Sequence, residues 1–182
     1  MKRFAMLVAA VVLSTTFLFG NQAQAGENTV FLDTKDGRIT IELLPDLAPK
    51  HVAQIKTLVK EGFYDGIVFH RVIDGFMAQT GDPTGTGMGG SKLPDIPAEF
   101  TAEPFKRGIV GMARSQNPDS ANSQFFIMLA DGDFLNGNYT VFGKVTAGMD
   151  VVDKIKKGSK ADNGAVANPD KIIKMVMESD AG

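Results

Sequence analysis

The chain has no cysteine. It can therefore form no disulfide, offer no thiolate nucleophile and build no thiolate metal site, so its stability must come from a packed core. The residue to which bacterial lipoproteins usually attach lipid is also missing at the start of the expected mature chain. We therefore expect a free protein without a lipid anchor.

Histidine is nearly as scarce, since only His51 and His70 are available. We expect His51 on the exposed side of a helix. We expect His70 to point away from the apolar face that contains Phe69, as a hydrogen-bonded structural residue. A histidine metal site is not expected, and no metal ligand is assigned. The sequence also has no Gly-x-Ser-x-Gly turn and no local mark of a Ser-His-Asp set, so covalent catalysis is not expected.

Long apolar runs are confined to the N-terminus. Lys2 and Arg3 precede an apolar run from Phe4 to Phe19, and the sequence Ala23-Gln24-Ala25 follows it. This is the pattern of a secretory signal peptide over residues 1–25, cleaved after Ala25, and its apolar run is shorter than a comfortable membrane span. We expect a periplasmic protein, with secretion as the second choice, and no membrane anchor after cleavage.

Length and charge limit the function classes further. The chain has 182 residues and 43% hydrophobic content, which is enough for one well-buried domain, and we expect a single domain over residues 26–182. Loss of Lys2 and Arg3 leaves 17 of the 19 basic residues against 21 acidic ones, a net charge near −4. Nucleic acid is not an expected partner of such a chain.

Alternation of apolar and polar residues dominates the mature chain and predicts mostly antiparallel β structure. Two alternating runs surround the turn at residues 35–37, which predicts a β-hairpin with an apolar face made of Val30, Leu32, Ile39, Ile41 and Leu43. Further strands are predicted at residues 67–69, 109–112, 124–129, 141–145 and 172–177. Their close spacing favours a closed barrel over layered α/β repeats.

Two segments change to helical spacing. Between Pro49 and Gly62 the apolar residues Val52, Ile55 and Val59 recur with the period of a helix, with proline in the first turn and glycine at the end. A second short helix is predicted over residues 149–156. No internal repeat, low-complexity tract or interdomain linker interrupts the chain.

Residues 85–90 match the pattern G-x-G-x-x-G. That pattern indicates dinucleotide binding only between a strand and a helix, and Pro94 and Pro97 argue against a helix after it. We interpret the segment as a mobile loop at the border of a peptide groove and assign no nucleotide cofactor.

Two short segments carry the chemistry. Residues 69–82 read FHRVIDGFMAQTGD, and residues 123–127 read SQFFI. As strands with alternating faces, they would place an arginine and a glutamine beside an apolar patch, while Phe125 and Ile127 face the core. The residues brought together in this way are Arg71, Gln79, Phe76, Met77 and Phe126. A permanently charged donor beside a small apolar hollow suits a ligand that is apolar and rich in carbonyls, such as proline in a peptide.

Together with residues 141–145, VFGKV, these segments resemble the cyclophilin family of peptidyl-prolyl cis-trans isomerases, and closely its bacterial exported, periplasmic branch. The similarity extends from about Val30 to Glu178. It implies a mainly β fold, a closed eight-stranded antiparallel barrel capped by two α-helices, with the active groove on an outer face. It implies no cofactor.

The resemblance also assigns the site by position. Arg71 matches the family's catalytic arginine, and Gln79 matches the polar edge of the proline pocket, so both are expected in catalysis. Ala113 and Arg114 fall where the family holds the substrate backbone. The other matching positions form the walls, floor and rim of the substrate groove: Phe76, Met77, Gln124, Phe126, Phe134, Leu135 and Tyr139.

Three of these positions depart from the common pattern. Phe134 stands where eukaryotic members usually have a tryptophan that donates a hydrogen bond to cyclosporin, so weak binding of that drug is expected. Tyr139 replaces a groove histidine and removes a group that titrates near neutrality. Arg114 occupies a position that is often asparagine, and we expect it to reach toward acidic residues of a substrate.

The resemblance implies a peptidyl-prolyl cis-trans isomerase that accelerates rotation about Xaa-Pro bonds during folding of exported proteins, without covalent chemistry. Its partners would be proline-containing segments of unfolded or partly folded exported proteins, and we expect a monomer. The alternative is a proline-peptide-binding module or holding chaperone that uses the same groove without catalysis. Arg71 favours the enzyme, because a pure binder has no evident need for the arginine.

Overall fold

The computed structural model describes residues 26–182, so the expected signal peptide at residues 1–25 lies outside the described residues. One eight-stranded sheet has the strand order β3-β4-β6-β5-β7-β2-β1-β8, and its neighbours pair antiparallel. The strands are β1 (Thr29–Thr34), β2 (Gly37–Leu43), β3 (Arg71–Ile73), β4 (Met77–Thr80), β5 (Ile109–Met112), β6 (Phe125–Met128), β7 (Val141–Ala147) and β8 (Lys174–Met177). The prediction of a mainly β, antiparallel fold is confirmed.

The hairpin predicted from alternation is formed by β1 and β2. Thr34 pairs with Gly37 at the turn, and Gly37 has a φ of +134°, which favours glycine. The alternate apolar residues that face the core are buried, while Phe31 and most of the polar residues between them are less so. The buried face consists of Val30, Leu32, Ile39, Ile41 and Leu43. Burial of one face sets the register of the hairpin, because a slip by one residue would expose that face.

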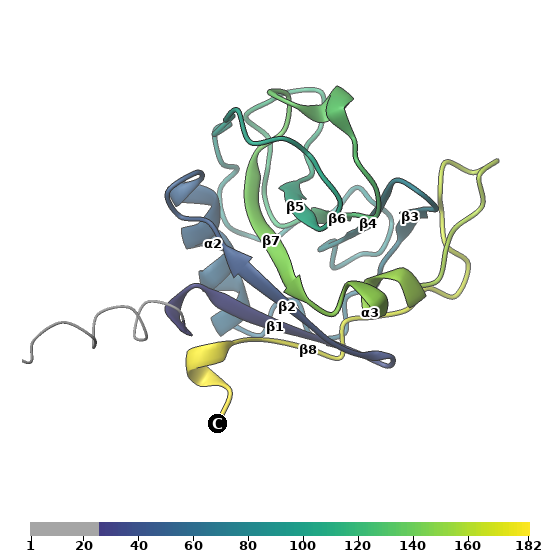
Figure 1. Cartoon of the computed structure of the whole chain (residues 1–182), viewed down its shortest axis with the longest axis horizontal. Coiled ribbons are helices and arrows are strands. Elements are labelled where there is room, and N and C mark those ends of the chain that lie inside the picture. Colours follow the sequence, from purple (N-terminus) through teal and green to yellow (C-terminus); the bar gives the residue numbers. More distant parts are fainter. Residues whose placement is uncertain (1–25) are drawn as a thin grey trace, which may run out of the picture.

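The sheet curls into a half-barrel (Figure 1). Its edge strands β3 and β8 do not pair with each other in the described chain. Instead, the segments before them meet at an isolated bridge between Val68 and Lys171, and the Phe69 N–H donates to the Asp170 carbonyl at 2.8 Å. Full closure of the barrel therefore stays a prediction, because no continuous ladder joins the two edges.

The helices α2 (Pro49–Lys60) and α3 (Met149–Lys154) lie against different parts of the curled sheet (Figure 1). Proline stands in the first turn of α2, where its missing N–H costs no hydrogen bond. The predicted apolar stripe of α2 is buried in the core. The second helix ends two residues earlier than predicted, because Ile155 has extended backbone angles, with φ −55° and ψ 130°.

The strand predicted at residues 67–69 is wrong as a regular strand. Ile67 and Phe69 are buried in the core, but Val68 makes only an isolated bridge, and the nearby strand β3 begins at Arg71. An apolar run of three residues indicates burial, which is confirmed. It does not distinguish a strand from an extended segment that pairs at one position.

Both histidines are buried, which corrects the prediction that His51 is exposed. His51 lies on the same face of α2 as Ile55, and its Nδ1 lies 2.7 Å from Glu99 Oε2. His70 is 8% exposed, and neither of its ring nitrogens has a hydrogen-bond partner among residues 26–182, so its expected hydrogen bond is missing. Burial lowers the pKa of both histidines below the usual 6.5.

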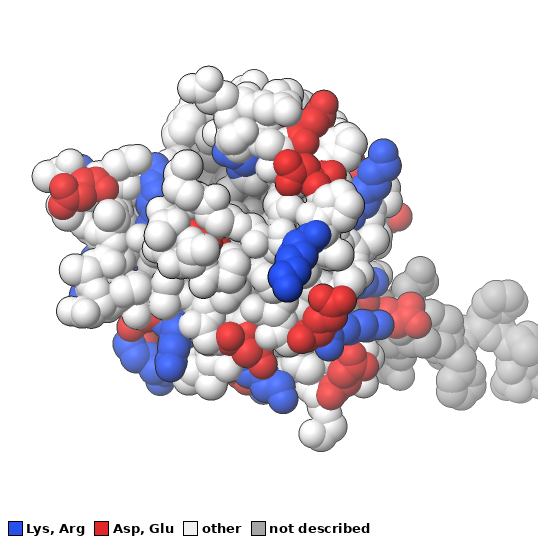
Figure 2. Space-filling model, turned by 180° about the vertical axis from the view of Figure 1, so that it is seen from behind, with Lys and Arg blue, Asp and Glu red and all other residues white. Residues whose placement is uncertain are grey.

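Charged residues of both signs are mixed on the surface. In Figure 2, Lys and Arg side chains lie close to Asp and Glu side chains over the lower part of the face shown. Two arginines form close ion pairs, with 2.7 Å between Arg107 Nη2 and Asp153 Oδ2 and 2.7 Å between Arg38 Nε and Asp33 Oδ1. Within residues 26–182, no helix combines the length and the apolar content that a membrane span needs.

Candidate active site

One hollow on the molecule contains every predicted site residue except Gln124. It has a volume of about 500 Å³. The residues that line it are Arg71, Phe76, Met77, Gln79, Ala113, Arg114, Phe126, Phe134, Leu135, Asn138 and Tyr139. We call it the apolar hollow. Asn138 is the one lining residue that the sequence did not suggest.

Strand pairing brings the polar residues of the site together. Arg71 of β3 is directly opposite Gln79 of β4, and Gln79 is directly opposite Phe126 of β6. Because directly opposed residues of antiparallel strands point to the same face, the charged and aromatic side chains share one side of the sheet. The next positions along β6, Phe125 and Ile127, are buried in the main core, as alternation predicted.

A relay of hydrogen bonds orients the amides of the site. Arg71 Nη1 donates to Gln79 Oε1 at 3.2 Å, and Gln79 Nε2 donates to Gln124 Oε1 at 2.9 Å. Gln124 Nε2 then donates to the carbonyls of Gly87 and Gly89 at 3.0 and 2.8 Å. Gln124 therefore supports the wall beside the apolar hollow instead of lining it.

The floor of the apolar hollow is a small second core. Met77, Phe126 and Leu135 are buried in it at 2%, 4% and 7% exposure. Gly111 is opposite Phe126 in the β5–β6 register, and a Cβ at Gly111 would lie 2.6 Å from Phe126 Cζ. A side chain at Gly111 would therefore displace the Phe126 ring.

Aromatic rings contact one another at the floor and at the rim of the apolar hollow. Phe126 stacks on Phe105 with ring centroids 5.8 Å apart, and Tyr139 meets Phe126 edge-on, also at 5.8 Å. At the rim, Phe76 and Phe134 lie 5.3 Å apart, and Phe134 is 68% exposed. A rigid ring at the floor and an accessible ring at the rim suit a small apolar group that enters from solvent.

Arg114 is bound to the protein's own backbone. Its Nη2 donates to the Asn138 carbonyl at 2.9 Å and its Nη1 donates to the Ser115 carbonyl at 2.8 Å, while its Cζ lies 4.6 Å from the centre of the Tyr139 ring. This geometry does not match the prediction that Arg114 reaches toward acidic residues of a substrate. The guanidinium instead fixes Tyr139 at the rim through a cation–π contact.

Arg71 is a half-buried cation with neutral partners. Burial lowers its pKa from the usual 12.5, and the nearby Tyr139 opposes that change. No carboxylate among residues 26–182 forms an ion pair with it, in contrast to Arg38 and Arg107. An arginine in a protein stays protonated at neutral pH, so the hollow holds a positive charge that no counter-charge neutralises.

A second hollow of about 630 Å³ adjoins the first and shares Gln79, Ala113 and Arg114 with it. Residues 87–91 form one of its walls, so the glycine-rich loop borders a groove, as expected. Residues 85–98 contain no helix, whereas a dinucleotide-binding motif needs a helix directly after its glycine-rich loop.

The glycine-rich loop is organised around one buried carboxylate. Asp82 is 1% exposed and accepts hydrogen bonds from the backbone N–H groups of Thr84, Gly87 and Gly89 at 2.7, 2.6 and 3.1 Å. Burial alone would raise the pKa of Asp82, but these hydrogen bonds outweigh it and lower the pKa to about 2. The loop is thus built on a side chain that is ionised at neutral pH.

A residue far along the chain completes the surroundings of Arg71. The Asn163 carbonyl accepts from Arg71 Nε at 2.9 Å, and Asn163 Oδ1 accepts from Arg71 Nη2 at 3.0 Å. The sequence did not suggest this residue, because a contact across 92 positions leaves no periodic signal. The Asn-Gly pair at residues 163–164, typical of a left-handed turn, was the available signal.

For metals, no group of three or more His, Asp or Glu side chains converges within residues 26–182.

The family model for the cyclophilin type peptidyl-prolyl cis-trans isomerase matches residues 29–177. A probable peptidyl-prolyl cis-trans isomerase of Brucella suis is 63% identical over 190 residues, covering 98% of this chain and 97% of the relative. A peptidyl-prolyl cis-trans isomerase of Acinetobacter baylyi is 39% identical over 199 residues, again covering 98% of this chain and 97% of the relative.

Solved structures agree with this similarity. A cyclophilin from Hirschia baltica superposes with a TM-score of 0.77 at 30% identity, covering 86% of this chain and 76% of that one. A cyclophilin type isomerase from Cryptosporidium parvum, crystallised in the presence of the dipeptide Ala-Pro, has a TM-score of 0.75 at 31% identity, covering 82% of this chain and 98% of that one. The chain belongs to the cyclophilin-type peptidyl-prolyl cis-trans isomerase family.

Proposed function

We propose that this cyclophilin-type isomerase accelerates rotation about Xaa-Pro bonds in exported proteins, with Arg71 as the catalytic residue and the apolar hollow as the proline pocket. The observation that carries the proposal is the position of an unneutralised guanidinium at the wall of a hollow whose floor is Met77, Phe126 and Leu135. One side of such a site can hold a pyrrolidine ring while the other side acts on its amide.

The reaction needs no bond to be made or broken. Resonance of the peptide bond sets a rotation barrier of about 18–20 kcal/mol, and Xaa-Pro bonds cross it unaided in roughly tens to hundreds of seconds. A turnover of about 10³ s⁻¹ would be an acceleration near 10⁵-fold, which requires roughly 7 kcal/mol of selective stabilisation of the transition state.

Arg71 can supply that selectivity. Twisting the amide localises the lone pair on the prolyl nitrogen, so a fixed donor binds the twisted form better than either planar isomer. Two of the five guanidinium N–H groups have no partner among residues 26–182, since Asn163 takes two N–H groups and Gln79 takes one. Because these partners hold the guanidinium before substrate arrives, little reorganisation is needed at the transition state.

Proline-containing segments of unfolded or partly folded exported proteins are the proposed substrates. The related isomerase crystallised with Ala-Pro supports proline peptides as the ligand class. The second hollow, which continues from the first past Gln79, Ala113 and Arg114, gives room for residues that flank the proline. Gln79 and the backbone near Arg114 would hold that flanking part of the substrate.

We also propose that the protein acts in the periplasm as a monomer of one domain, residues 26–182. The support is the N-terminal pattern of two basic residues, an apolar run and Ala23-Gln24-Ala25. Fractionation of the native cell, with mass spectrometry of the N-terminus, tests this part. A periplasmic protein that begins at Gly26 is expected, and a cytoplasmic protein that keeps residues 1–25 would contradict it.

A protease-free measurement of cis-to-trans relaxation in a short Xaa-Pro peptide tests the activity. NMR exchange spectroscopy on the peptide alone and with catalytic amounts of the protein would report the rate directly. The proposal expects a large increase in exchange at substoichiometric protein. Unchanged exchange with retained binding of the peptide would favour the alternative, a binding module or holding chaperone.

A further inference from the structure

β3 lies at an edge of the sheet, and residues 158–166 occupy its free side. The Val72 N–H donates to the Gly164 carbonyl at 2.8 Å, and the Val72 carbonyl accepts from the Gly158 N–H at 2.9 Å. The Val166 N–H donates to the His70 carbonyl at 3.1 Å. The segment therefore pairs with β3 on both sides of Arg71 and is held in register with it.

Close packing fixes this segment against β3. Gly164 has a φ of +83°, and a Cβ there would lie 2.5 Å from Ile73 Cγ1. A Cβ at Gly158 would overlap the Gly164 carbonyl, which belongs to the same turn. A larger residue at Gly158 would require a shift of backbone, and one at Gly164 would displace the Ile73 side chain and strain a positive φ. Both glycines therefore allow the turn to lie close against the strand.

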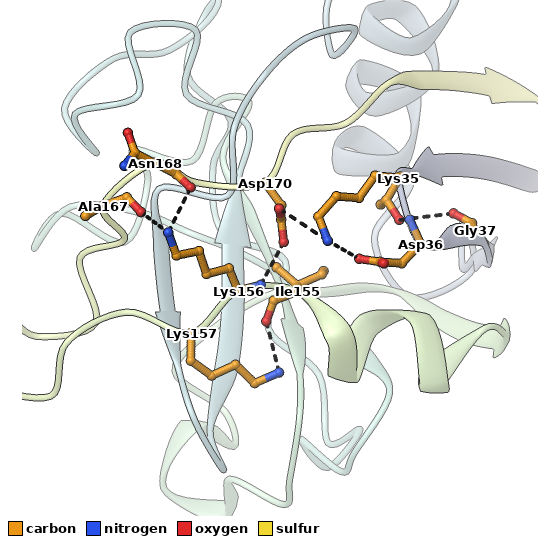
Figure 3. Close-up of polar contacts among 10 residues, drawn as sticks. Lys35, Asp36, Gly37, Ile155, Lys156, Lys157, Ala167, Asn168 and Asp170 are labelled. Carbon is orange, nitrogen blue, oxygen red and sulfur yellow. Dashed lines mark hydrogen bonds and ion pairs between the residues drawn. The ribbon is translucent and has the colours of Figure 1, made fainter.

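The two ends of the segment are tied together at its base (Figure 3). Lys156 Nζ donates to the carbonyls of Ala167 and Asn168 at 2.5 and 3.2 Å. The Lys156 N–H donates to Asp170 Oδ2 at 2.9 Å, and Asp170 Oδ1 lies 3.6 Å from Lys35 Nζ in the β1–β2 turn. The base is thereby anchored to the body of the half-barrel.

The pairing and packing of residues 158–166 place Asn163 beside the active site. Asn163 has a φ of +51°, in the left-handed region that asparagine tolerates better than most residues. Its carbonyl and its Oδ1 together accept from Nε and Nη2 of Arg71, at 2.9 and 3.0 Å. These two contacts occupy one whole edge of the guanidinium plane.

We propose that Asn163 is a positioning residue for catalysis: it clamps one edge of Arg71 so that the remaining N–H groups face the prolyl nitrogen of the substrate. The inference rests on the proposed isomerase function. Gln79 holds only Nη1, so without Asn163 the guanidinium plane could turn about the Cδ–Nε bond and lose the geometry that favours the twisted amide.

The test is Asn163→Gly, which keeps the left-handed backbone and the carbonyl contact but removes Oδ1. We expect kcat for an Xaa-Pro peptide to fall about five- to tenfold, with KM changed by less than about twofold. NMR of the Arg71 guanidinium should show restricted rotation about Nε–Cζ in the wild type and faster rotation in the variant. In Asn163→Asp, which keeps an acceptor at the same place, rotation of the guanidinium should stay restricted.

Asn168→Gly is the matched control. Asn168 has the same φ of +51° and lies two residues after the segment, but no contact with Arg71 involves its side chain. Its kcat and its guanidinium rotation should equal those of the wild type. In an Arg71→Ala background, Asn163→Gly should cause no further loss, because its effect acts through Arg71.

Failure of the inference is separable from failure of the proposed function. An active wild type with free guanidinium rotation would overturn the inference even if Asn163→Gly did not fold. Equal kcat in wild type and Asn163→Gly, or an equal loss in Asn168→Gly, would also overturn it. A wild type that does not accelerate peptide exchange would overturn the proposed function, while restricted rotation would still show the clamp.

Discussion

Arg71 Nη1 donates to Gln79 Oε1 at 3.2 Å because the two residues are directly opposed in the β3–β4 register. The contact fixes which end of the Gln79 amide faces the arginine. The other end then donates to Gln124, which in turn holds the glycine-rich loop. One residue pair thus couples the cation of the site to the wall of the second hollow.

Gln79→Ala should lower kcat/KM for an Xaa-Pro peptide by about tenfold. The variant removes one hydrogen bond to a charged group and leaves Gln124 Oε1 without its donor. Peptide exchange measured by NMR would report the change, with thermal unfolding to verify the fold. Gln116→Ala, at an exposed glutamine, is the control and should be unchanged. A Gln79→Ala enzyme of wild-type efficiency would show that the relay has no part in catalysis.

Activity should change by less than about twofold between pH 6.5 and 8. Arg71 has a pKa lowered from 12.5 by burial but, as an arginine, remains charged throughout this range. Burial also lowers the pKa of His51 and His70 from 6.5, so both are neutral above that pH. A profile of kcat/KM against pH checks this expectation. A titration with a midpoint near pH 7 would require an active group that the site does not contain.

Asp82→Asn should lower the free energy of unfolding by about 2 kcal/mol at pH 7. Hydrogen bonds outweigh burial and hold the pKa of Asp82 at about 2 against 3.8, a difference that corresponds to roughly that energy. Because the pKa is lowered in the folded state, this contribution is present above about pH 4 and is lost as the pH falls toward 2.

Urea unfolding of wild type and Asp82→Asn at several pH values would measure the difference. Asp46→Asn, at an exposed carboxylate, is the control and should change stability by less than about 0.5 kcal/mol. A difference between wild type and Asp82→Asn that is as large at pH 2.5 as at pH 7 would show that ionisation is not its cause.

Phe134→Trp should strengthen binding of cyclosporin by about tenfold. Phe134 lies at the exposed rim of the apolar hollow, where an indole N–H can reach a ligand and add one hydrogen bond. Titration calorimetry would compare the variant with the wild type. Phe134→Leu, which adds no donor, should not gain affinity. An equal gain in both variants would point to shape instead of the hydrogen bond.

Much of the fold could be predicted from the sequence because its signals are local. Alternation around residues 35–37 predicted the β1–β2 hairpin, and helical spacing predicted α2. The error at His51 was avoidable, since it precedes Ile55 by four residues and Leu58 by seven and so lies on their buried face. Glu99, which pairs with His51 from 48 positions away, could not be foreseen from local spacing.

The same distinction between local and long-range signals applies to the residues of the site. Strand alternation indicated correctly that Arg71, Gln79 and Phe126 share a face, because side-chain direction has a period of two. The position of Gln124 in the second hollow and the clamp from Asn163 depend on how distant loops pack. Those contacts follow from positive φ angles and tertiary hydrogen bonds, which leave no repeating pattern in the sequence.

The exchange rate of a proline peptide with Arg71→Ala tests the central claim most directly. Arg38→Ala, at an exposed arginine paired with Asp33, is the control for loss of one positive charge. The account predicts that Arg71→Ala lowers turnover by a factor of about 10² or more while the peptide still binds and Arg38→Ala keeps the wild-type rate. An Arg71→Ala protein that isomerises the peptide at the wild-type rate would contradict it.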